Sequence, residues 1–235
     1  MTLVTGSARG LGSAVARALR GRGDRVHVVY LTSQAEVPQL EREFEGRVHR
    51  ADLTVESEVT RLVGAVVERD RRLDCAVHAV GEYVSGPLEA ASAASLARML
   101  RSNVESAFHL MNAARSELRR THGTALFFGC AGLEGLRARR ETAVYAAAKS
   151  ALLVLVRAWA LEEARFGVRV NMLSPGLVPH AHAAGDTLDP QRQARIPLGR
   201  AGRPEDIASA ALFLCSDAAS HVTGVDLEVA GGWML

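Results

Sequence analysis

The sequence predicts an α/β fold: a doubly wound parallel sheet of about seven strands, covered by helices on both faces and forming a single domain over residues 1–235. Short apolar runs alternate with longer segments of helical periodicity along the whole chain. The runs show little polar alternation, which is typical of strands buried on both faces of a parallel sheet. No internal repeat, low-complexity tract or linker divides the chain.

The short apolar runs predict the strands. In chain order they are residues 2–5, 25–31, a short run led by Val48, and residues 74–77, 124–128, 168–173 and 225–229. Because crossovers between parallel strands are right-handed, the ligand crevice of such a fold lies beyond the carboxyl ends of the strands. Functional residues should therefore directly follow strands.

The segments between the strands predict helices. They are residues 11–20, 37–44, 55–70, 88–119, 143–166 and 204–215. Segment 88–119 contains one long helix, with a short helix before it as the alternative. Over 55–70 the apolar residues recur at helical spacing, at Val55, Val59, Leu62, Val63, Val66 and Val67.

The composition excludes several classes of protein. Apolar residues make up 48% and charged residues 23% of the chain, and no apolar run reaches the ~20 residues that span a bilayer. Of 28 Lys and Arg residues only Lys149 is a lysine, so 27 are arginines, and they are scattered under a net charge of +2. Three cysteines, Cys75, Cys130 and Cys215, offer no C-x-x-C spacing. With no signal peptide before the first strand, we expect a cytoplasmic protein without nucleic-acid or membrane partners.

The turn after the first strand predicts a dinucleotide site. Residues 6–12, GSARGLG, have the glycine spacing G-x-x-x-G-x-G. Such a turn lets backbone approach a pyrophosphate at a helix N-terminus. A plain loop is the alternative for three glycines alone, but the strand before and the helix after favour the cofactor site. The expected contacts are Gly6, Ser7, Arg9, Gly10, Leu11 and Gly12.

The ends of the second and third strands refine this prediction. Asp52, followed by Leu53, comes directly after the third strand, where a carboxylate can accept a hydrogen bond from an adenine amino group; helix capping by Asp52 or Thr54 is the alternative. The second strand ends at Thr32 and Ser33 without an acidic residue to hold a ribose 2′-hydroxyl. With Arg9 in the turn, this favours NADP(H) over NAD(H), unless Arg9 is only a solvated surface charge.

Tyr145 and Lys149 lie four residues apart at the start of a predicted helix and therefore project from one face. The only lysine of the chain stands where a compact, titratable ammonium would be needed, a role that arginine fills poorly. Further motifs accompany the pair in a fixed order: TGSARGLG at 5–12, ADLT at 51–54, Asn103, YAAAK at 145–149, RVNMLSPG at 169–176, and the closing segment 197–232.

On these motifs the chain resembles the classical short-chain dehydrogenase/reductase family over nearly its whole length. Within that family it is most similar to beta-ketoacyl-ACP reductases and polyketide ketoreductases. The resemblance implies a Rossmann-type fold and an NADPH-dependent ketoreductase in which Tyr145 gives a proton to a carbonyl oxygen. Lys149 would lower the pKa of that phenol and bond the nicotinamide ribose, and Asn103 would hold a water that links Lys149 to solvent.

The resemblance also implies further contacts and an assembly. Gly81, Pro175, Gly176 and Val178 would contact the cofactor, and residues 177–199 would form a small substrate lid. The substrate would be a small-molecule or carrier-bound acyl compound. Family members commonly pair through long helices, so a homotetramer is expected, with a dimer as the alternative.

The chain departs from the family pattern in three places. Alignment on Gly132 puts Gly129 at the position of the usual catalytic Ser, with Cys130 next to it. Residues 78–81 read HAVG in place of the usual Asn-Asn-Ala-Gly, and His180 takes the place of a Thr that contacts the nicotinamide amide. We expect Gly129, Cys130 and His180 on the substrate side of the site.

Two nearby hydroxyls could replace the missing Ser: Thr142, in the charged loop 136–142, and Ser85 after the fourth strand. The pair His180 and His182 lacks an obvious third ligand, so no metal site is predicted. The altered residues leave two other functions open: a catalytically silent cofactor-binding subunit that pairs with an active relative, or an alcohol dehydrogenase that runs the reverse reaction.

Overall fold

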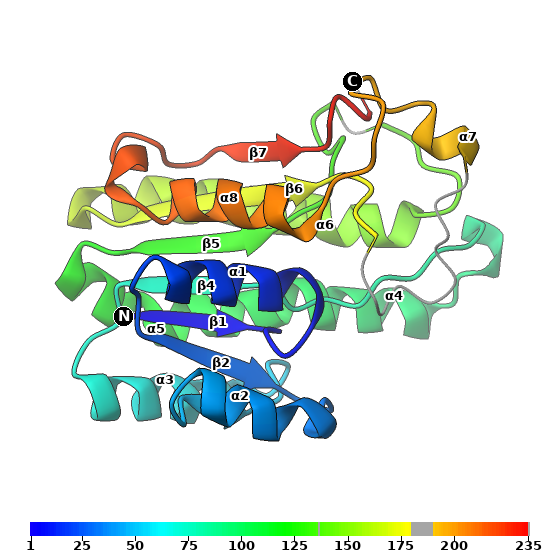
Figure 1. Cartoon of the computed structure of the whole chain (residues 1–235). Coiled ribbons are helices and arrows are strands. Elements are labelled where there is room, and N and C mark those ends of the chain that lie inside the picture. Colours follow the sequence, from blue (N-terminus) through cyan, green and yellow to red (C-terminus); the bar gives the residue numbers. More distant parts are fainter. Residues whose placement is uncertain (136, 180–189, 235) are drawn as a thin grey trace.

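The structure, a computed structural model, describes residues 1–135, 137–179 and 190–234 and contains one sheet of seven parallel strands (Figure 1). The strands are β1 (Thr2–Thr5), β2 (Val26–Tyr30), β3 (Val48–Arg50), β4 (Cys75–His78), β5 (Thr124–Phe128), β6 (Arg169–Pro175) and β7 (Asp226–Val229). Their spatial order is β3-β2-β1-β4-β5-β6-β7. The chain winds outward from β1 to β3 and then returns to β4, so the order reverses between β1 and β4. The doubly wound prediction is confirmed, and the reversal marks the point where ligands bind in such sheets.

The helices confirm the predicted segments and add detail. They are α1 (Gly10–Gly21), α2 (Val37–Glu43), α3 (Glu56–Asp70), α4 (Ala93–Leu100), α5 (Ser106–Thr121), α6 (Ala143–Glu163), α7 (Pro190–Gln193) and α8 (Pro204–Leu214). Segment 88–119 takes the alternative form, with the short α4 before the long α5, and a π-helical turn, Arg101–Glu105, joins them. The four-residue α7 was not predicted, because the polar sequence PQRQ has no helical periodicity.

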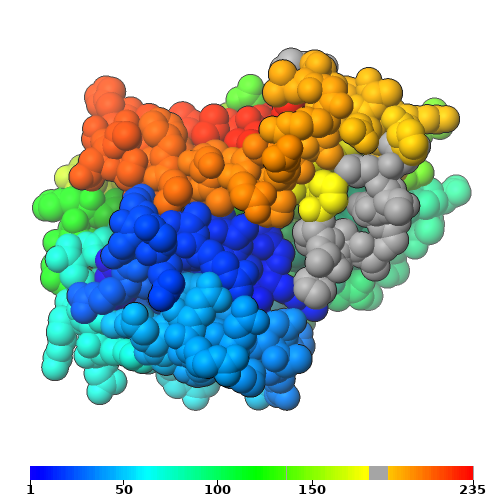
Figure 2. Space-filling view, viewed as in Figure 1, coloured from blue at the N-terminus to red at the C-terminus, as the bar shows by residue number. Residues whose placement is uncertain are grey.

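Two apolar cores cover the two faces of the sheet. Successive residues of β1 divide between them: Leu3 belongs to the core under α3, α5 and α6, and Val4 to the core under α1, α2 and α8. Both side chains are fully buried. Helices α1 and α8 lie side by side on the second face (Figures 1 and 2). This packing makes the sheet a rigid support whose carboxyl edge carries the loops.

Segment Ala143–Phe166 is long and apolar enough, by length and composition, to cross a membrane. In the fold its buried face packs on the sheet, where Leu152, Val156 and Trp159 belong to the first core. The apolar character of α6 is explained by this burial. The same helix carries Tyr145 and Lys149 at its N-terminal end.

Candidate active site

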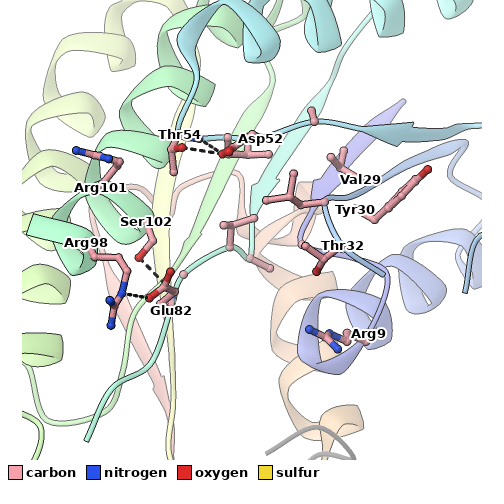
Figure 3. Close-up of a pocket in the computed structure, with 17 residues that line it drawn as sticks. Arg9, Val29, Tyr30, Thr32, Asp52, Thr54, Glu82, Arg98, Arg101 and Ser102 are labelled. Atoms are coloured by element: carbon pink, nitrogen blue, oxygen red, sulfur yellow. Dashed lines mark hydrogen bonds and ion pairs between the residues drawn. The ribbon is translucent and has the colours of Figure 1, made fainter. Parts of the chain in front are cut away.

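A cavity of about 490 Å³ opens at the carboxyl ends of the strands, at the reversal between β1 and β4 (Figure 3). Its size is that of a typical small-molecule or cofactor site. Seventeen residues line it: Gly6, Arg9, Val29, Tyr30, Leu31, Thr32, Ala51, Asp52, Leu53, Thr54, Ala79, Val80, Gly81, Glu82, Arg98, Arg101 and Ser102. Among them are the predicted cofactor residues Gly6, Arg9, Thr32, Asp52, Leu53 and Gly81, which the structure brings together from four different strand ends.

The glycine turn has the close packing that requires glycine. Gly6 has φ +66°, and a Cβ there would lie 2.5 Å from the carbonyl oxygen of Ala79. A Cβ at Gly12 would meet the backbone of Gly6 in the same way. Helix α1 begins at Gly10, directly after Arg9. The turn therefore presents bare backbone and a helix N-terminus beside the cavity, as pyrophosphate binding needs.

Several predicted cofactor residues are not part of the cavity wall. The Ser7 hydroxyl donates to Val4 O (2.6 Å) and accepts from Val29 N (2.8 Å), so it ties the turn to β2. Leu11 and Val178 pack against the second core. The remaining predicted residues outside the wall are Gly10, Gly12, Tyr145, Lys149, Pro175 and Gly176. Their contact with a cofactor stays a prediction.

Asp52 lines the cavity directly after β3. Its Oδ1 accepts hydrogen bonds from the backbone N–H (2.9 Å) and the hydroxyl (2.7 Å) of Thr54 (Figure 3). Helix α3 begins after Val55, and no side chain caps it. The capping alternative is therefore wrong, and the carboxylate stays beside the cavity within a tight turn.

One wall of the cavity was missed by the sequence analysis. Arg98 of α4 donates to Glu82 Oε2 at 2.7 Å, and Glu82 N donates to the hydroxyl of Ser102 at 3.3 Å (Figure 3). Arg101, from the π-helical turn, completes this wall. The position of Glu82, directly after Gly81, was a usable signal, whereas two arginines among 27 were not distinguishable.

Lys149, Asn103 and Gly81 meet behind the cavity. Lys149 is only 3% exposed, and its ammonium donates to the carbonyl oxygen of Phe128 at 2.6 Å. Asn103, in the π-helical turn, donates through Nδ2 to Met99 O and Glu82 O, each at 3.1 Å. Its Oδ1 is buried and has no partner among the described residues. A Cβ on Gly81 would collide with this oxygen and lie 3.3 Å from Lys149 Nζ, so only glycine fits at this point, where the Asn103 amide and the Lys149 ammonium both approach the backbone.

The electrostatics of Tyr145 and Lys149 are dominated by burial. Burial lowers the pKa of Lys149 to about 8. Burial also raises the pKa of the Tyr145 phenol well above its usual range, and the nearby Cys130 thiol and Tyr83 phenol raise it further. The ring of Tyr83 lies edge-on to that of Tyr145, with 5.0 Å between ring centroids. Lys149 Nζ lies 5.7 Å from the Tyr145 ring centroid, and the expected lowering of the phenol pKa is not seen in this arrangement.

Gly129 and Cys130 differ in what surrounds them. A Cβ on Gly129 would lie 2.6 Å from Met172 Sδ and closer still to the hydroxyl of Ser174, so a serine side chain has no room there. Cys130 packs against the core under α6. Its charge state would affect the pKa of both Tyr145 and Lys149, while burial raises the pKa of its own thiol. Cys130, as a neutral thiol, is therefore the residue that lies beside the Tyr–Lys pair.

The other departures from the family pattern have different outcomes. His78 is fully buried: its Nε2 lies 2.9 Å from the Ser106 hydroxyl, and burial with the charge of Lys149 lowers its pKa to about 3. Thr142 is the residue before α6, and Ser85 lines a separate pocket of about 140 Å³. Among the residues that the structure describes, no hydrogen bond joins either hydroxyl to Tyr145.

His180 and His182 lie outside the described residues, as does the whole of segment 180–189 of the predicted lid 177–199. Within the parts of the chain that the structure describes, no group of three His, Cys, Asp or Glu side chains is arranged to hold a metal ion. The prediction that the pair His180 and His182 binds no metal is therefore not tested.

Residues 6–234 match the family described as Enoyl-(Acyl carrier protein) reductase. The chain belongs to the short-chain dehydrogenase/reductase family. It is accordingly an NAD(P)-dependent oxidoreductase with a Rossmann-type fold.

Individual relatives cover the chain almost completely. The L-fucose dehydrogenase of Oryctolagus cuniculus is 36% identical over 99% of this chain and 84% of its own length. A blue fluorescent protein from a metagenomic library, solved in complex with NADPH, superposes with a TM-score of 0.91 at 26% identity, covering 100% of this chain and 97% of that one. A short-chain dehydrogenase/reductase from Mycobacterium ulcerans has a TM-score of 0.91 at 31% identity, covering 99% and 89%.

Proposed function

We propose that this protein is an NADPH-dependent ketoreductase with Tyr145 as proton donor. The observation that carries the proposal is the placement of the only lysine. It is buried, its Nζ lies 5.7 Å from the Tyr145 ring centroid, and next to it at Gly81 lies Asn103 Oδ1, which has no partner among the described residues. When bound, NADPH supplies a hydride to the carbonyl carbon, and the proton of the Tyr145 hydroxyl goes to the carbonyl oxygen.

Each residue of the site has a defined task in this reaction. In this proposal Lys149, whose Nζ lies 5.7 Å from the Tyr145 ring centroid, stabilises the tyrosinate in the complex with cofactor and substrate; in the structure without them it does not offset the effect of burial on the phenol pKa. The buried Oδ1 of Asn103 has no partner among the described residues, and together with the nearby Lys149 ammonium it suits a water that returns a proton to the pair. The Cys130 thiol donates a weak hydrogen bond toward the carbonyl oxygen, in place of the serine hydroxyl that the family resemblance leads us to expect.

The preference for NADPH is supported by the wall near the end of β2. Arg9 and Thr32 both line the cavity, and the residues that follow β2 include no carboxylate up to Glu36. A guanidinium and a hydroxyl suit a 2′-phosphate, whereas an acidic residue would repel it. Titration with NADPH and NADH, followed by fluorescence, tests this point.

The substrate class has two candidates. The motif resemblance favours a beta-ketoacyl thioester or related polyketide carbonyl. Several curated relatives carry the name L-fucose dehydrogenase, which favours the oxidation of a sugar alcohol. A silent subunit remains the third candidate, because the serine position has changed.

The deciding experiment is a panel of ketoacyl thioesters, quinones and sugars, assayed in both directions with NADP(H) and NAD(H). We expect reduction that is lost in Tyr145→Phe, while cofactor binding is retained. Binding of NADPH without any Tyr145-dependent turnover contradicts the proposal and favours the silent subunit. Light scattering tests the accompanying proposal of a homotetramer, and fractionation of cells tests the cytoplasmic location.

A further inference from the structure

A buried histidine at the end of β4 is connected to the π-helical turn that carries Asn103. His78 and Ser106 are both fully buried, and His78 Nε2 lies 2.9 Å from the Ser106 hydroxyl oxygen. That hydroxyl donates to Ser102 O at 2.6 Å. Because its single proton is used in this way, its oxygen accepts from His78, so His78 carries its proton on Nε2. The three residues therefore form one hydrogen-bonded chain from the sheet to the turn.

This chain satisfies a carbonyl group that the π-helical register leaves without its usual partner. The backbone N–H of Ser106 donates to Arg101 O, five residues back, rather than to Ser102 O, four residues back, as in an α-helix. The Ser106 hydroxyl takes the place of that N–H at Ser102 O. A hydroxyl bond to the carbonyl four residues back bends a helix. The chain therefore favours the π-helical turn over a regular α-helix.

The turn decides where the Asn103 side chain points. Each residue of an α-helix advances by about 100° around the axis, so loss of the π register would rotate the turn against α5. In the observed register Asn103 Nδ2 donates to Glu82 O and to the Ser102 hydroxyl, each at 3.1 Å. Asn103 Oδ1 then lies at Gly81, where a Cβ would collide with it and lie 3.3 Å from Lys149 Nζ. The register of the turn therefore brings Asn103 to the lysine.

His78 acts through its hydrogen bond and not through charge. Burial and the charge of Lys149 lower its pKa to about 3, so the ring is neutral near pH 7. Its Nδ1 is buried and has no partner among the described residues, which leaves Nε2 as the nitrogen that holds the turn. Residue 78 is also one of the positions at which the chain departs from the asparagines of the family pattern.

We propose that His78 and Ser106 are positioning residues, which hold the π-helical turn so that Asn103 meets Lys149. The inference rests on the proposed ketoreductase function and adds two residues to it. Both side chains are fully buried and neither lines the cavity, so they act through Asn103 and not by contact with cofactor or substrate.

The test removes the links of the chain one at a time. Ser106→Ala deletes the hydroxyl, His78→Met deletes the N–H donor, and His78→Gln keeps an N–H donor near the position of Nε2. Ser106→Ala and His78→Met should lower kcat about 10- to 100-fold and change KM for the carbonyl compound about threefold or less, as expected for a displaced relay group. His78→Gln should recover most of the loss, because the hydrogen bond is kept. If His78→Met does not fold, Ser106→Ala decides alone.

Thr124→Val is the matched control. The Thr124 hydroxyl is also buried and donates to a backbone carbonyl, Arg169 O, at 3.1 Å, but it lies at the amino end of β5, away from the cavity. Thr124→Val and Ser106→Ala should both lower Tm by about 2–8 °C, whereas only Ser106→Ala should lower kcat. An equal loss of kcat in both proteins, an unchanged kcat in Ser106→Ala, or a His78→Gln protein as impaired as His78→Met overturns the inference.

A crystal structure of Ser106→Ala separates this inference from the proposed function. We expect the turn to relax toward the α-helical register, with Ser102 O accepting from the backbone N–H of residue 106 and Asn103 Oδ1 moved by about 1 Å or more from Gly81. The same turn and the same Asn103 position in variant and wild type overturn the inference. If the wild-type protein reduces no carbonyl compound while the variant structure changes as expected, the ketoreductase proposal fails and the positioning of Asn103 stands.

Discussion

The contrast between Gly129 and Cys130 can be tested with two serine substitutions. Cys130→Ser puts a hydroxyl near Tyr145 and Lys149, where the structure has a half-buried thiol. Gly129→Ser puts the hydroxyl where alignment on Gly132 places it. The two variants differ by one position in the chain but meet different surroundings.

The magnitudes follow from those surroundings. One oxyanion donor is worth about 10²–10³ in rate, and a thiol already supplies part of it, so Cys130→Ser should raise kcat by roughly tenfold. In Gly129→Ser the new Cβ would lie 2.6 Å from the sulfur of Met172, which is fully buried. Its other neighbour, Ser174, is held by a hydrogen bond to Asp226 at 2.5 Å. Overpacking of this kind costs about 1–3 kcal/mol, or a fall in Tm of about 2–12 °C for a domain of this size.

The assay is NADPH oxidation followed at saturating carbonyl substrate, together with thermal melting of each variant. Cys130→Ala is the control that removes the donor without adding one, and it should lower kcat while keeping Tm within a few degrees of wild type. Two results together refute the role of Cys130 as hydrogen-bond donor to the carbonyl oxygen: a Gly129→Ser protein that has the Tm of the wild type and a higher kcat, and a Cys130→Ser protein whose kcat does not rise.

Three further predictions concern other parts of the fold. Gly81→Ala places a methyl group against Asn103 Oδ1 and 3.3 Å from Lys149 Nζ, so kcat should fall at least about tenfold while NADPH binding persists. An unchanged kcat in a steady-state assay contradicts a role in turnover for this arrangement of Lys149 and Asn103. Thr32→Asp should raise the ratio of the Kd for NADPH to the Kd for NADH by about tenfold or more, because a carboxylate repels the 2′-phosphate. Fluorescence titration measures both constants, and an unchanged ratio speaks against cofactor discrimination at this position. Burial lowers the pKa of His49 from 6.5 to about 4, so on acidification His49 takes up a proton in the unfolded protein before it does so in the folded protein. The contribution of His49 to the free energy of unfolding is therefore fully present above pH 6.5, and about 1–2 kcal/mol of it is lost as the pH falls to 4. Denaturant titration should find a smaller loss in His49→Gln.

The strands and the cofactor turn were predictable because their signals are local. The buried run at Thr2–Thr5 and the glycines after it depend on nearest neighbours in the chain, and a parallel fold leaves few other arrangements for them. Asp52 was predictable for the same reason, since it directly follows a strand.

The surroundings of Gly129 and Cys130 could not be predicted from local sequence. Alignment on Gly132 uses only the order of residues in the chain. The direction in which the side chains after β5 point depends on the pairing of β5 with β6, which continues through a hydrogen bond from Gly129 N to Leu173 O. The wall formed by Glu82 and Arg98 was equally hidden, because residues 16 positions apart meet only through the fold of α4.

The single lysine also makes the protein unusually easy to observe. Lys149 carries the only side-chain amine of the chain, and the only other amine, that of Met1, is held in a salt bridge to Asp74 at 2.8 Å. Isotopic labelling of lysine would therefore give one ammonium signal, with no assignment needed. Its titration, without and with NADPH, would record the protonation of the catalytic centre directly in solution, in a way that enzymes with many lysines do not permit.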